Sequence, residues 1–155
     1  MTCVDLVATH AFRCGPDPIF ALSVDAGRFP QCFAGFGPIP AIRAIQLHGS
    51  LAAGTTRTID NSDGSSLTET ITQVTPPHEH HYTLQGFRPP FSWLVRKAQA
   101  QWCIDGSADH SAVTWRYRFE LTSPLAFPIA APLLRVFMAG AMRRCLQRMA
   151  QLLQA

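Results

Sequence analysis

The apolar residues change from a period of two to a period of 3.6 near residue 132, and this change limits the folds open to the chain. Before it, alternating segments are separated by glycine, proline and Asn-Ser-Asp-Gly breaks. Alternation predicts half-buried strands, whereas the later spacing predicts one long amphipathic helix that ends near residue 153. The expected strands cover residues 4–9, 41–48, 55–60, 66–75, 80–85, 94–104 and 112–121.

Two short helices are expected between the first and second strands. Asp17 is placed as the cap of the first helix, with Pro18 in its first turn and Gly27 at its end; the second covers about residues 29–33. Residues 124–132 are expected to be a crossing segment. The apolar stripe of the long helix comprises Leu134, Phe137, Met138, Ala141, Met142, Cys145, Met149 and Leu152. Sequential strands and one amphipathic helix predict an α+β fold, a curved antiparallel sheet of about seven strands around the helix.

Composition indicates a single domain over residues 1–155 with a substantial core. Hydrophobic residues make up 47% of the chain and charged residues 15%, which excludes a disordered polar segment. The net charge is +3, and the arginines near the C-terminus are interpreted as a solvated helix face. Nucleic acid is therefore not expected as a partner, because its binding sites usually carry a denser basic stripe with interleaved aromatic residues.

The cysteines and the N-terminus favour a cytoplasmic location. The five cysteines are widely spread and form no C-x-x-C pair, so reduced thiols are expected rather than a disulfide framework. The N-terminus has Asp5 where a signal peptide would carry basic residues. The longest apolar stretch, residues 129–142, contains Pro132 and Arg135 and is too short to span a bilayer, so stable membrane insertion is not expected.

Several motifs along the chain resemble those of one superfamily. They are DPIFAL at 17–22, FGPIP at 36–40, GTTRT at 54–58, DGS at 63–65 before ETIT at 69–72, Pro76-Pro77 with Tyr82, GFRPPF at 86–91 and TWRYRF at 114–119. The chain resembles the START-like (SRPBCC) superfamily of polyketide cyclases/dehydrases and lipid-transfer proteins, which have the helix-grip fold of the birch-pollen allergen. The resemblance implies an internal cavity for a hydrophobic compound. It carries over no catalytic motif, since some members are cyclases and others only carry ligands.

The hairpin centred on Asp63 predicts a pair of opposite charges. Antiparallel pairing about this turn places Arg57 opposite Glu69 and Ile59 opposite Leu67, with threonines on the other face. Arg57 and Glu69 then lie on the apolar face, as a polar anchor for a ligand or as an acid/base pair. A structural salt bridge at the rim of the sheet is the alternative.

The hairpin over residues 105–110 predicts a face of large aromatic side chains. Its expected pairs are Trp102–Val113, Ala100–Trp115 and Ala98–Tyr117, with Phe119 on the same face. The outward face would hold Lys97, Gln99, Gln101, Arg116, Arg118 and Glu120. The aromatic side chains either wall a cavity or interlock as ordinary core.

These patterns yield a set of candidate site residues. The expected ligand-binding residues are Arg57, Glu69, Ile71, Tyr82, Trp102, Trp115, Tyr117, Phe119, Phe137, Met138 and Met142. Among them, Arg57, Glu69 and Tyr117 are the candidates for acid/base catalysis.

No cofactor and no metal are expected. His78-Glu79-His80-His81 holds metal-ligand types, but it follows Pro76-Pro77 and is interpreted as a turn with solvent-exposed histidines. Cys32 and Cys103 have no activating partner in the sequence.

Two features concern the loops and the long helix. Phe33, Phe36, Ile39 and Phe91 flank loops that form either a lid or the closed end of the core. Gly140 lies mid-helix, where a close contact, a bend or a hinge would explain a residue that weakens helices.

Three functions remain open. The first is binding or transport of a hydrophobic small molecule such as a lipid or a polyketide. The second is an aromatase/cyclase or dehydratase-type enzyme, and the third and weakest is a protein-interaction module. Binding is favoured over catalysis, and a homodimer is left open.

Overall fold

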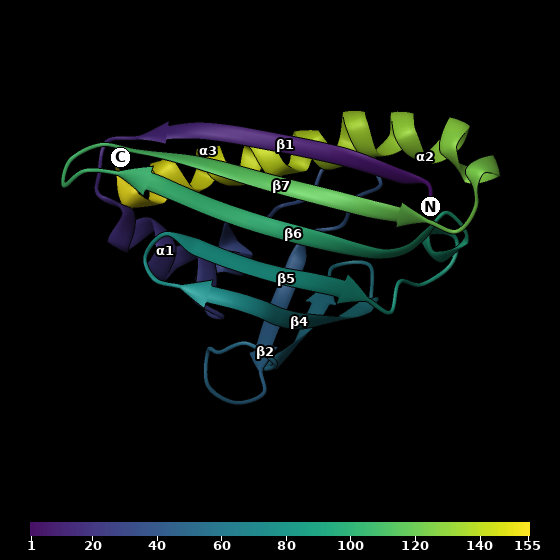
Figure 1. Cartoon of the computed structure of the whole chain (residues 1–155), viewed down its shortest axis with the longest axis horizontal. Helices are drawn as coiled ribbons and strands as arrows, with labels where there is room; N and C mark the ends of the chain where they lie inside the picture. Colours follow the sequence, from purple (N-terminus) through teal and green to yellow (C-terminus); the bar gives the residue numbers. More distant parts are fainter.

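The computed structural model describes residues 1–155 as one seven-stranded antiparallel sheet folded around a C-terminal helical segment (Figure 1). In spatial order the strands are β1 (Cys3–Phe12), β7 (Ser111–Leu121), β6 (Val95–Gly106), β5 (Glu79–Gln85), β4 (Ser66–Thr75), β3 (Thr56–Asn61) and β2 (Ile42–Leu47). Sequential strands pair from β2 to β7, and β1 joins the far edge beside β7. The predicted α+β helix-grip fold is confirmed.

The short helices lie where they were expected, but their caps differ. Helix α1 (Pro16–Val24) begins at a proline after Gly15, and Asp17 lies in its first turn rather than at the cap. The helix ends before Asp25, whose Oδ1 accepts a hydrogen bond from the backbone N–H of Gly27. The cap prediction for Asp17 was wrong because Pro16 already suits the first helical position. The second short element, η1 (Phe29–Gln31), is a single 3₁₀ turn.

The C-terminal helical segment begins earlier than predicted. It comprises η3 (Pro124–Ala126), α2 (Phe127–Leu133), the π-helical turn η4 (Leu134–Met138) and α3 (Ala139–Leu153). The expected crossing segment is therefore helical. Pro124 and Pro128 lie in the first turn of their elements. The backbone N–H groups there have no partner within the helix, so the N–H that proline lacks costs no hydrogen bond. Pro132 lies inside α2, and the π-helical turn begins two residues later, at Leu134.

This segment, Pro124–Leu153, is long and apolar enough to cross a bilayer by length and composition alone. It is longer than the apolar stretch of residues 129–142 that the sequence indicated, because residues 124–132, expected to be a crossing segment, are helical and continuous with the long helix. Half of its most apolar window is buried inside the protein, as in the core helix of a globular fold.

The two hairpins differ in how well their register was predicted. Between β3 and β4, Arg57 lies opposite Glu69, as predicted. Between β6 and β7, Trp102 lies opposite Trp115 and Ala100 opposite Tyr117, so the predicted pairing was wrong by two residues. The backbone N–H of Ser107 donates to the carbonyl of His110, and this places the turn one residue later than expected. A shift of two keeps every side chain on its predicted face.

The hydrophobic core forms where the helices cover the sheet. Helix α3 packs on β1, and α1 packs on β6 and α3. The helix stripe is buried from Leu134 to Met149 except for Phe137, which is half-buried, whereas Leu152, predicted to belong to it, is 43% exposed. The outer face of the sheet is polar, as the alternation predicted. The large hydrophobic side chain that it exposes is Val7 on β1.

Gly140 allows a close contact between the helix and the loop before β2. A Cβ atom at this position would lie 2.6 Å from Cδ2 of Phe36. The Phe36 ring also packs against Phe137, with ring centroids 5.6 Å apart, and the Arg144 guanidinium lies 3.9 Å from its centroid. The close-contact explanation for Gly140 is therefore confirmed, and Phe36 attaches its loop to the helix.

We expect Gly140→Ala to destabilise the protein although alanine is the better helix former. Alanine usually stabilises a helix interior by about 1 kcal/mol relative to glycine, but here its methyl group would displace the Phe36 ring. In a Phe36→Ala background the same change should become stabilising by about that amount. Urea denaturation of the four proteins in this double-mutant cycle measures the change of sign. A stabilising Gly140→Ala in the wild-type background would contradict the prediction.

Candidate functional site

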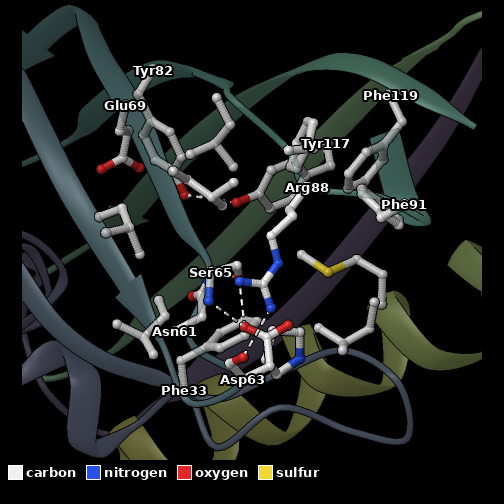
Figure 2. Close-up of a pocket in the computed structure, with 18 of the residues that line it drawn as sticks. Phe33, Asn61, Asp63, Ser65, Glu69, Tyr82, Arg88, Phe91, Tyr117 and Phe119 are labelled. Carbon is white, nitrogen blue, oxygen red and sulfur yellow. Dashed lines mark hydrogen bonds between the residues drawn. The ribbon is translucent and has the colours of Figure 1, made fainter. Parts of the chain in front are cut away.

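A cavity of about 390 Å³ lies between the concave face of the sheet and the loops at its β2 end (Figure 2). Its size falls within the usual range of small-molecule sites. Most lining residues are hydrophobic, and they come from β2 to β7, η1, the loops around residues 38–40 and 87–91, and the helix at Leu133 and Met138. The polar side chains of the lining are Ser23, Arg57, Asn61, Asp63, Ser65, Glu69, His80, Tyr82, Arg88 and Tyr117, with the two indole N–H groups of Trp102 and Trp115.

Most candidate site residues lie in this lining. They are Arg57, Glu69, Tyr82, Trp102, Trp115, Tyr117, Phe119 and Met138. Ile71, Phe137 and Met142 do not line the cavity. Ile71 and Met142 are fully covered by neighbouring groups, and Phe137 turns toward Phe36.

Arg57 and Glu69 form a buried ion pair in the cavity wall. Nε of Arg57 lies 2.7 Å from Oε2 of Glu69, and both side chains are less than a tenth exposed. Arg57 also donates from Nη2 to Nε2 of His80 at 2.9 Å, and its guanidinium lies 5.5 Å from the Tyr82 ring centroid. The charge of Arg57 thus has three neighbours, which offset part of the cost of its burial.

His80 is a site residue that sequence analysis missed. The segment after Pro76-Pro77 was predicted to be a turn with exposed histidines, yet β5 begins at Glu79 and the His80 side chain is 2% exposed. The alternation of His80, Tyr82 and Leu84 was the available signal. Burial and the charge of Arg57 lower the pKa of His80 to about 3, so its ring is neutral at neutral pH.

The neutral His80 ring leaves one buried N–H without a partner. Nε2 accepts the hydrogen bond from Arg57, so the ring proton lies on Nδ1. Nδ1 is buried and has no hydrogen-bond partner, and the same holds for Nε1 of Trp115. Two lining residues, His80 and Trp115, therefore carry an unused donor.

Among the carboxyl groups that line the cavity, Glu69 has the pKa that departs most from its ordinary value. Desolvation by burial raises its pKa to about 7, although the positive charge of Arg57 opposes this shift. A carboxyl group with such a pKa is partly protonated at neutral pH and can act as an acid or a base there.

A chain of aromatic side chains links the middle strands. Nε1 of Trp102 donates to the hydroxyl of Tyr82 at 3.2 Å, and the hydroxyls of Tyr82 and Tyr117 are also 3.2 Å apart. Burial raises the pKa of both phenols above the ordinary value, so they are neutral donors and acceptors. If Tyr82 donates to Tyr117, the hydroxyl proton of Tyr117 is left for a ligand.

Polar groups at one side of the cavity come from the β3–β4 turn. Arg88 reaches across and donates from Nη2 to the backbone carbonyl of Asp63 at 3.1 Å (Figure 2). Oδ1 of Asp63 accepts hydrogen bonds from the backbone and side chain of Ser65, and these bonds lower the Asp63 pKa. Sequence analysis missed Arg88 as a site residue because its loop meets this turn only in the folded chain.

The loop residues proposed as a lid divide into two groups. Phe33, Ile39 and Phe91 line the cavity. Phe36 lies outside the cavity, where its ring packs against Phe137 and Gly140 of the helical segment. This contact holds the loop that carries Ile39 in place.

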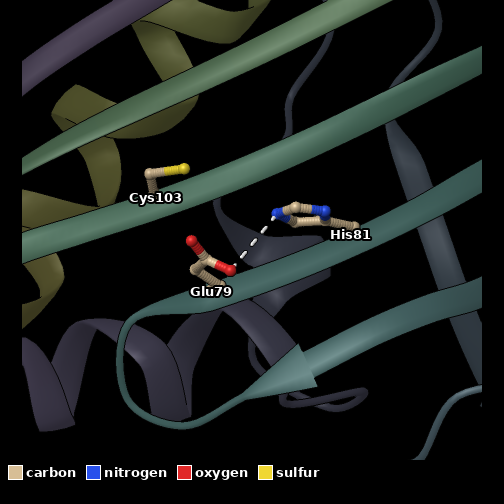
Figure 3. A group of neighbouring side chains, drawn as sticks. All are labelled: Glu79, His81 and Cys103. Atoms are coloured by element: carbon tan, nitrogen blue, oxygen red, sulfur yellow. Dashed lines mark ion pairs between the residues drawn. The ribbon is translucent and has the colours of Figure 1, made fainter.

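The group of side chains that could hold a metal lies away from the cavity. Glu79 and Cys103 face each other on β5 and β6, with His81 two residues along, on the outer face of the sheet (Figure 3). Their ligand atoms all lie within 4.8 Å of one another, and the types suit zinc. However, Glu79 already accepts a hydrogen bond from Gln73, and burial raises the pKa of Cys103, which disfavours the thiolate that a metal requires.

Comparison with solved structures shows the same fold in proteins of low sequence identity. Norcoclaurine synthase from Thalictrum flavum, in complex with dopamine and hydroxybenzaldehyde, matches with a TM-score of 0.73 and 13% identity over 99% of this chain and 87% of that one. Ara h 8.0201 matches with a TM-score of 0.68 and 13% identity over 97% and 99%.

A di-domain aromatase/cyclase, BexL of the BE-7585A biosynthetic pathway, is also similar. Its TM-score is 0.72 at 10% identity, over 96% of this chain and 49% of the di-domain protein. At these identities the likeness establishes the fold alone. No curated protein shows significant sequence similarity to this chain.

A family model matches almost the whole sequence. The model describes polyketide cyclase/dehydrase and lipid-transport proteins and matches residues 4–154. Its match agrees with the motifs noted in the sequence and with the sheet wrapped around a C-terminal helix. The chain therefore belongs to the polyketide cyclase/dehydrase and lipid-transport family.

Proposed function

We propose that this chain is a single ligand-binding domain that holds a hydrophobic small molecule, of the lipid or polyketide class, in the cavity. We place it in the cytoplasm, and the five cysteines, all free in the structure, support a reducing compartment. The outer face of the sheet is polar, which disfavours a protein-interaction surface there.

The observation that carries this proposal is a largely apolar cavity with unused donors in its wall. Protein interiors are normally close-packed, so a space of about 390 Å³ leaves many side chains short of contacts. His80 and Trp115 each bury an N–H without an acceptor, at a cost of about 1–3 kcal/mol. A ligand with an apolar body and one or two carbonyl or hydroxyl oxygens would fill the space and accept such hydrogen bonds.

We expect Leu67→Trp to weaken ligand binding strongly without unfolding the protein. Leu67 is half-buried and lines the cavity, so an indole at this position would occupy space that a ligand needs. The measurement is a fluorescence titration with anilinonaphthalene sulfonate, together with native mass spectrometry of any co-purified molecule. The variant should bind the probe about tenfold more weakly or worse.

Val7→Trp provides the matched control, because Val7 lies on the outer face of the sheet and is half exposed. It introduces the same side chain and should leave probe binding unchanged. Equal affinities for the wild type and the Leu67→Trp variant would place the probe outside the cavity and contradict the proposal.

A second candidate function is a cyclase or dehydratase-type reaction, and the acidity of Glu69 favours it. Such a reaction needs a group that accepts and returns a proton near neutral pH, and burial brings the Glu69 pKa to about 7 inside the cavity wall. The Arg57 guanidinium beside it could stabilise a developing negative charge on a substrate oxygen, and Tyr117 could donate a proton. The first test is whether Glu69 titrates in this range.

We expect the free energy of unfolding to fall by about 1 kcal/mol between pH 6.5 and about pH 8 because of Glu69. Its folded-state pKa lies above the ordinary value of 4.5, so the folded protein binds this proton more tightly than the unfolded chain. Stability from this group is therefore lost as the pH rises through the folded-state pKa. His80 has the opposite effect, because its pKa is lowered: its contribution to stability rises with pH until about pH 7.5, one unit above its ordinary value of 6.5, and offsets part of the Glu69 loss.

Urea denaturation as a function of pH measures this loss. Glu69→Gln should remove this loss, whereas Glu120→Gln, on the outer face of the sheet between Arg96 and Lys97, should keep it. A wild-type profile with the same shape as that of Glu69→Gln over this range would exclude Glu69 as a base at neutral pH.

A further inference from the structure

Exposed hydrophobic side chains gather on one face of the C-terminal helical segment. Leu125 is 88% exposed, Ile129 62% and Val136 53%. The buried side chains of the same stretch are Ala126, Ala130, Ala131 and Leu134, so these three exposed side chains lie on its outer side. We call Leu125, Ile129 and Val136 the apolar helix face. Figure 1 shows α2 at the β1 edge of the sheet.

The region of the apolar helix face also adjoins the cavity. Leu133, on the inner side of the same helical segment, lines the cavity, so the two sides of one helix contact different surroundings. Trp93 is 71% exposed, and its carbonyl accepts a hydrogen bond from Thr122, two residues before η3. Trp93 belongs to the short 3₁₀ turn η2 (Phe91–Trp93). Phe91, in the same turn, and Leu94, which follows it, line the cavity.

The charge of the same segment has one sign. Residues 121–155 contain four arginines and no acidic side chain. These arginines are Arg135, Arg143, Arg144 and Arg148; all are exposed, and none forms an ion pair. Arg135 lies over the Phe127 ring, and Arg148 donates to the carbonyl of Gln31, contacts that leave the positive charge uncompensated.

We propose that the apolar helix face, with Trp93 and the exposed arginines of the same segment, docks on the surface of an anionic lipid bilayer. Exposed aliphatic side chains and unpaired arginines along one helical segment, with an indole nearby, are the composition of helices that lie in the membrane interface. The apolar groups enter the boundary between headgroups and acyl chains, and the arginines pair with lipid phosphates. The helix stays packed on the sheet, so docking requires no insertion across the bilayer.

Charge and shape favour a bilayer over a protein partner. The apolar side chains protrude from a convex helix rather than forming a groove for a partner protein. The segment also has no acidic side chain that could pair with basic groups of a protein and so fix its orientation. A second copy of the chain would bring like charges together, because its segment carries the same arginines. The proposal does not depend on what the cavity binds, although docking would bring the cavity close to a source of apolar ligands.

Vesicle flotation tests the proposal with the whole chain. We expect the protein to float with phosphatidylcholine vesicles that contain about 30 mol % phosphatidylglycerol, and not with phosphatidylcholine alone. About 0.5 M salt should release most of it. Ile129→Asp should weaken partitioning at least about tenfold, and Arg143→Gln about fivefold. Val7→Asp is the matched control: it places the same charge at an exposed hydrophobic position on the sheet and should bind like the wild type.

Trp93 provides an independent spectroscopic signal. Trp102 and Trp115 are buried, so a blue shift of tryptophan emission on adding anionic vesicles should come from Trp93. Trp93→Phe should still float but lose the shift. The proposal is overturned by absence of flotation at low salt, by equal weakening in Val7→Asp and Ile129→Asp, or by a dimer in light scattering that Ile129→Asp dissociates.

Discussion

One helix cannot cover the concave face of a seven-stranded sheet, and most features of this structure depend on that mismatch. Strands about 4.8 Å apart make a sheet about 29 Å wide, whereas a helix with its side chains is about 10–12 Å wide. Helix α3 covers the β1 side, and α1 fills the space beside β6. The strands from β2 to β5, with parts of β6 and β7, are left facing a cavity that loops close at its rim.

The uncovered part of the sheet is where charged and polar groups face inward. Arg57, Glu69 and His80 occupy positions that alternation directs toward the interior, and all three line the cavity. Their burial accounts for the perturbed acidity of the site, because desolvation disfavours the charged form of both the carboxyl and the imidazole. A cavity wall of this kind suits ligand binding and allows proton transfer, and the titration of Glu69 separates these two uses.

The C-terminal segment has a different role on each side. Its inner side completes the core and contributes Leu133 and Met138 to the cavity wall. A slot at Gly140 receives Phe36 and so holds the loop that carries Ile39 against the cavity. Its outer side exposes the apolar helix face beside arginines that no carboxylate neutralises. The same helix thus supports the site and provides the proposed membrane contact.

The sequence by itself determined the succession of strands along the chain, the long helix and the Arg57–Glu69 pair, because periodicity and a five-residue turn act over short distances. The β6–β7 turn is centred one residue later than predicted, so Trp102 pairs with Trp115 instead of Val113. The Trp102 side chain is still on the predicted face of the sheet, but its cross-strand partner differs. Only the tertiary structure decided that Arg88 meets Asp63, that His80 contacts Arg57 and that Leu125 stays exposed. These outcomes depend on how far the sheet curves and how much of it one helix covers, and no local pattern of residues specifies either quantity.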